Sequence, residues 1–131
     1  MTPAMATAPA EGMGMDMQTD EALAGLARVL AREAAAVREL RDALVRQREG
    51  VAGNAIDAVQ GSCDDIARLL VTLDAAKRSR VGMLARLVPD GPGTLEAVAA
   101  LCGGSLPPAL AEASLALRRE AAATQGLSSR Q

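Results

Sequence analysis

The fold of this chain is decided by residues 40–70, LRDALVRQREGVAGNAIDAVQGSCDDIARLL. Apolar residues recur there at helical spacing on both sides of a short segment that contains two glycines and an asparagine. Gly50 and Gly53 favour the end of a first helix, and Asn54 can cap a second helix, with Asp57 three residues later. So short a linker cannot return along a long helix, and the two helices are therefore predicted to lie antiparallel.

The predicted first helix begins at Thr19, whose hydroxyl can cap it, and runs to about Glu49. A heptad repeat that starts at Leu23 places eight residues on one seam, and six of them are apolar. These seam residues are Leu23, Leu26, Leu30, Glu33, Val37, Leu40, Leu44 and Gln47. The small residues that flank the seam and let a neighbour approach closely are Ala27, Ala34, Ala36 and Ala43. The arginines of the opposite side are Arg28, Arg32, Arg38, Arg41 and Arg46.

The predicted second helix runs from about Ala55 to Leu87 and carries two heptad rows, in which eight of ten residues are apolar. The first row is Ile56, Cys63, Leu70, Lys77 and Leu84, and the second is Val59, Ile66, Leu73, Arg80 and Leu87. Both rows are expected to face the first helix. The residues predicted to be structural, in the densest part of both seams, are Leu40, Leu44, Leu70 and Leu73.

Two basic residues, Lys77 and Arg80, fall in this seam. They either let water enter between the helices or form a basic notch for a carboxylate, and long basic stems can lie along apolar surface in both cases. Pairing through the 50–54 turn places Arg80 opposite residues in the mid-twenties and Glu33 near residues 70–73. An internal ion pair between Glu33 and Arg80 is therefore not expected.

Residues 88–93, VPDGPG, break the second helix. A short helix capped by Thr94 follows and ends near Cys102, and Pro107 and Pro108 suit the first turn of a third amphipathic helix. The apolar stripe of this third helix is Leu106, Leu110, Ala113 and Leu117. The prediction is an all-α fold with a long antiparallel hairpin over 19–88, a disordered tail over 1–18, and a linker, short helix and C-terminal helix over 89–131.

The composition excludes most chemistry, since the chain has no aromatic residue and no histidine although half of it is hydrophobic. No histidine base or histidine-bound metal is possible, no phosphate-binding glycine loop is present, and the serines have no recognisable base. We therefore expect no enzyme activity and no cofactor. A net charge of -2 argues against nucleic-acid binding.

The two cysteines, Cys63 and Cys102, are far apart in the sequence and have no CxxC spacing. They are interpreted as small core residues, and a reducing cytoplasm is the simpler assumption than a disulfide. No run of about 18 apolar residues could span a membrane. A helical surface that binds a protein partner is therefore the expected route to function.

The hairpin resembles flagellar export chaperones of the FlgN type. The resemblance is carried by Leu40 to Leu44, Arg46 to Val51, Asn54, Ile56, Val59, Leu69, Leu70, Leu73, Arg80, Met83 and Leu84, and after the break by Thr94, Leu95 and Glu96. It covers about residues 23 to 101. One departure is the C-terminal segment over 121–127, which is shorter than in the family.

This resemblance implies a cytoplasmic chaperone that binds C-terminal helical segments of hook-associated proteins, keeps them soluble and export-competent, and possesses a client site in its C-terminal region. Docking to the flagellar export apparatus belongs to the same expectation, with the chain a monomer or a weak homodimer. The predicted partner-binding residues are Leu95, Val98, Leu106, Leu110, Leu117 and Leu127. In the alternative, the third helix only covers the apolar side of the hairpin. A further alternative is a homo-oligomeric coiled coil that acts as a structural or adaptor protein without a client.

Overall fold

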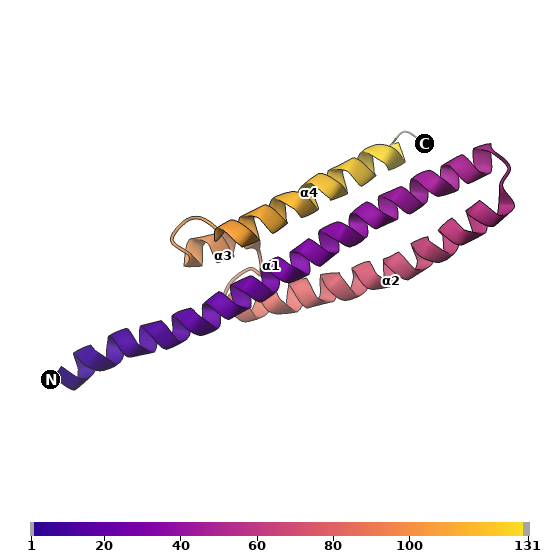
Figure 1. The fold of residues 1–131 in the computed structure, drawn as a ribbon. Coiled ribbons are helices and arrows are strands. Elements are labelled where there is room, and N and C mark those ends of the chain that lie inside the picture. The colour runs from indigo at the N-terminus through magenta and orange to yellow at the C-terminus, as the bar shows by residue number, and fades with distance from the viewer. Residues whose placement is uncertain (1, 130–131) are drawn as a thin grey trace.

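The computed structural model describes the backbone of residues 2–129 and the side chains of residues 17–127. Within this part the chain forms α1 (Thr2–Ala52), α2 (Ile56–Leu87), α3 (Leu95–Leu101) and α4 (Pro108–Ser129), and no strand. Figure 1 shows α2 and α4 on either side of α1, with the short α3 beside the start of α4. The all-α fold with a long helical hairpin is confirmed.

The N-terminal boundary of the first helix differs from the sequence prediction, because Thr19 lies inside α1 and does not cap it. The predicted disordered tail, residues 1–18, falls almost entirely on residues 1–16, whose side chains lie outside the described part of the chain. That prediction stays a prediction.

The hairpin turn lies between Ala52 and Ile56 and is tighter than expected. Backbone hydrogen bonds close it, with the Gly53 amide donating to the Glu49 carbonyl at 2.9 Å. Asn54 was predicted to cap α2, but it adopts a left-handed conformation with φ 57°, which asparagine tolerates better than most residues. Ala55 takes the N-cap position without a side-chain hydrogen bond, so the asparagine shapes the turn instead of capping the helix.

The central helix is α1, since α2 and α4 each pack against it. No described residues of α2 and α4 bring their Cα atoms within 8 Å of each other. The predicted seam of α1 is confirmed, because none of its eight residues is exposed. The flanking alanines are buried too, and they permit close helix contacts.

The predicted seam of α2 is half right. The row Val59, Ile66, Leu73, Arg80 and Leu87 is partly buried, as expected. The second packed row lies one residue earlier than predicted, since Leu69 is 1% exposed and Leu70 is 53% exposed. Ser62 belongs to the packed row and is buried, with its hydroxyl donating to the Val59 carbonyl at 2.8 Å. The assignment of Leu70 to the core is therefore wrong, because a buried serine and the adjacent Leu69 hid the true row.

The ion pair that was not expected is present: Arg80 Nε donates to Glu33 Oε1 at 2.9 Å, and Arg80 Nη2 donates to Glu33 Oε2 at 3.2 Å. Because α1 continues to Ala52, the turn is centred later than assumed and each pairing moves by about one helical turn. Helix side chains also lean toward their own N-terminus. In an antiparallel pair, this brings Arg80 and Glu33 toward each other.

A four-element core closes one end of the molecule, which we call the closed end. Its buried residues are Leu23, Leu26, Ala27, Leu30, Leu84, Val98, Leu110 and Ala113. The N-cap of α3 is confirmed, since the Ala97 amide donates to Thr94 Oγ1 at 3.1 Å. Gly103 and Gly104 have φ of 86° and 109°, which lets the chain reverse into α4 at this end.

The other half, residues 36–73 of the hairpin with residues 118–127 of α4, is the open end. Its hairpin core is small and consists of Ala36, Ala43 and Leu69, with Leu40, Ile66 and Leu73 packed against it. Here α4 runs parallel to α1, because Arg41 pairs with Glu120 and Arg48 donates to the Leu127 carbonyl seven residues further along both helices. At the open end, α1 therefore contacts both α2 and α4, while α2 and α4 do not approach each other.

Candidate functional site

The predicted partner-binding residues lie mostly inside the protein. Val98 and Leu110 are each 1% exposed. Leu95, Leu106 and Leu117 are partly buried against the same core. The structure therefore brings five of the six together at the closed end, while Leu127 lies partly buried near the far end of α4. In this arrangement Val98 and Leu110 cannot contact a client, and α4 covers an apolar side of α1.

Two polar contacts link α4 to α1 along the open end. The ion pair of Arg41 with Glu120 and the hydrogen bond of Arg48 to the Leu127 carbonyl, at 3.3 Å, hold this half. Both arginines come from α1, and Arg41 was predicted to lie on the free polar side of the helix. Its side chain is instead 24% exposed, since it reaches α4.

An apolar row on α2 is left open at the same end. Ile56 is 70% exposed, Leu70 is 53% exposed, and Cys63 between them is exposed as well. Their row continues to Leu84, which is 5% exposed and packs in the closed-end core with Leu110. The row is therefore covered at Leu84, within the closed-end core, and left exposed at Ile56, Cys63 and Leu70.

The helices α2 and α4 pack on different sides of α1. The contacts to α2 include Glu33, Arg46 and Gln47, and those to α4 include Arg41 and Arg48. The helices α2 and α4 therefore lie on either side of α1, as Figure 1 shows, and leave each other's outer surfaces uncovered.

Apolar surface is also uncovered at the hairpin tip. An open hollow of about 380 Å³ on α1 is lined there by Leu44, Gln47, Arg48, Val51 and Ala52. Val51 is 65% exposed, so this end of α1 keeps an aliphatic side chain in solvent.

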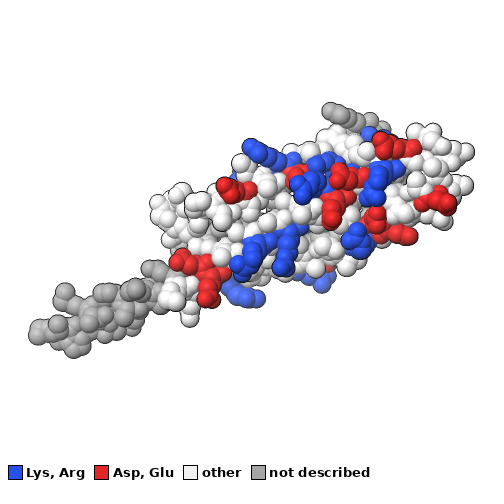
Figure 2. Space-filling view, in the orientation of Figure 1, with Lys and Arg blue, Asp and Glu red and all other residues white. Residues whose placement is uncertain are grey.

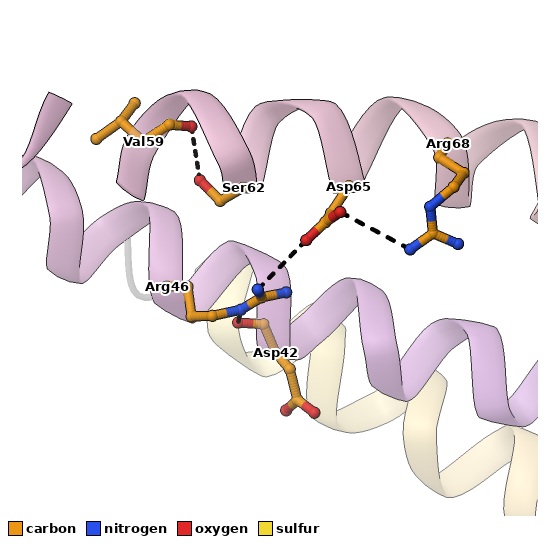
Figure 3. A network of polar contacts seen from close by, with 6 residues as sticks. All are labelled: Asp42, Arg46, Val59, Ser62, Asp65 and Arg68. Carbon is orange, nitrogen blue, oxygen red and sulfur yellow. Dashed lines mark hydrogen bonds and ion pairs between the residues drawn. The ribbon is translucent and has the colours of Figure 1, made fainter. Parts of the chain in front are cut away.

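Charged side chains link α1 and α2 near the hairpin tip. Arg46 donates to Asp65 Oδ2 at 3.3 Å, and Asp65 also pairs with Arg68 at 3.8 Å, as Figure 3 shows. Figure 2 shows many charged side chains along the face of the molecule seen there. Exposed pairs of this kind add little stability. The charged side chains here are therefore solvated, and the Arg46–Asp65 ion pair joins α1 to α2.

The two cysteines differ in their solvent exposure. Cys102 is partly buried against the closed-end core, as predicted. Cys63 was expected in the core but is exposed, and its Sγ accepts a hydrogen bond from Gln47 Nε2 at 3.1 Å. Both thiols are free, and no cluster of three or more metal-ligating side chains occurs among the described residues.

Sequence reasoning missed the exposed α2 row because it placed Ile56 and Leu70 in the hairpin seam. The available signal was the double leucine, Leu69 and Leu70, since neighbouring residues on a helix point in different directions. Comparison with protein-family models, with curated proteins and with solved structures gave no match to this chain. Over the described residues, no helix has both the length and the apolar character needed to cross a membrane.

Proposed function

We propose that this chain is a chaperone of the flagellar export type, which binds the C-terminal helical segment of a hook–filament junction protein. The observation that carries the proposal is the apolar row on α2, in which Ile56 and Leu70 are more than half exposed. The resemblance of residues 23–101 to that chaperone family supplies the identity of the client.

The physical argument concerns an amphipathic helix. Such a helix aggregates when its apolar side meets water, and a groove lined by aliphatic side chains can cover that side without any catalytic group. The function proposed is therefore protection by binding, and it uses no cofactor.

The test is capture of a junction-protein C-terminal segment by the full chain. The purified chain is immobilised and offered the segment from the organism that encodes it, beside a scrambled peptide of the same composition. We expect retention of the native segment alone, together with reduced aggregation of the junction protein in light scattering. Equal retention of both peptides, or of neither, would contradict the proposal.

A second candidate function is self-association through α2, favoured by the exposure of Val71, at 72%, and Val81, at 53%, in addition to Ile56 and Leu70. Exposed aliphatic side chains on a helix can mark a partner surface. A solution mass measured by light scattering separates the two functions. A stable dimer that refuses the junction segment supports the structural role, and a monomer that binds the segment supports the chaperone.

A further inference from the structure

We draw no further inference here: the strongest candidate, the open hollow of about 400 Å³ between α1 and α2 that Val29, Arg32 and Val71 help to line, is a mostly exposed apolar surface, and nothing in the structure shows what covers it.

Discussion

The closed end and the open end are built on the same helices but filled differently. At the closed end Leu30 of α1, Val98 of α3 and Leu110 of α4 are each 1% exposed, so large side chains from three helices meet. At the open end the hairpin core is Ala36, Ala43 and Leu69, and α4 contacts only α1. The comparison shows that one end carries most of the apolar burial and the other keeps apolar surface uncovered. Stability and binding are therefore expected at opposite ends.

The largest expected difference between the ends comes from leucine truncation. Leu30→Ala should lower the free energy of unfolding by about 2–5 kcal/mol, because a fully buried leucine loses its transfer energy and leaves a cavity. Leu70→Ala should change it by less than about 1 kcal/mol, since the side chain is already half exposed. Chemical denaturation of both variants measures this contrast. Similar losses at both sites would show that the open end is packed as tightly as the closed end.

The ion pair between Glu33 and Arg80 lies where the two ends meet. Glu33→Ala should cost about 1–3 kcal/mol, because the Glu33 side chain is 10% exposed and Arg80 would lose both of its acceptors. A double-mutant cycle with Arg80→Ala in urea denaturation gives the coupling free energy. A coupling near zero would mean that water already solvates the pair.

Two glycines inside α2 provide a smaller, stabilising test. A Cβ added at Gly61 or at Gly82 meets no atom within 4 Å, so neither glycine marks a close helix crossing. Gly61→Ala should raise the free energy of unfolding by about 0.5–1 kcal/mol through helix propensity. Gly25→Ala is the contrasting variant, since its Cβ would lie 2.7 Å from Met83 Cε and that side chain must move. A thermal melt that ranks Gly25→Ala above Gly61→Ala would contradict this reasoning.

The smallest expected effect concerns the attachment of α4. Arg41→Ala removes the ion pair with Glu120 and should cost about 0.5–1 kcal/mol, because both side chains are partly exposed. Hydrogen exchange should show faster exchange at residues 117–127 and unchanged protection near Leu110. Uniform acceleration along α4 would mean that the helix is released as one unit.

Much of this fold could be predicted from the sequence. Heptad spacing placed every α1 seam residue correctly, and Pro, Gly and Thr94 marked the break, the cap and the start of α4. The second row of α2 failed because counting apolar residues favours Leu70 over Leu69 and overlooks the buried Ser62. The ion pair of Glu33 with Arg80 failed because the register depends on where α1 ends, and sequence fixes helix ends within a few residues only.

The candidate site was harder to predict for a geometric reason. A stripe of leucines on α4 indicates that this helix packs against something, but it does not say whether that surface is a client or the same chain. Leu110 packs against α1 in the closed-end core. The exposed α2 row depends on α4 contacting α1 without reaching α2, and that arrangement is a property of three helices together.

The parallel course of α1 and α4 has a consequence for helix dipoles. Parallel neighbours place both negative C-terminal ends on the same side of the molecule, whereas the antiparallel α2 presents its positive end there. The last turn of α4 has no basic residue of its own, and Arg48 of α1 donates to the Leu127 carbonyl, one of the last that the helix leaves unpaired. A cation from one helix thus neutralises the end of another, and dissolved salt should loosen the end of α4 while the leucine core beneath α3 stays intact.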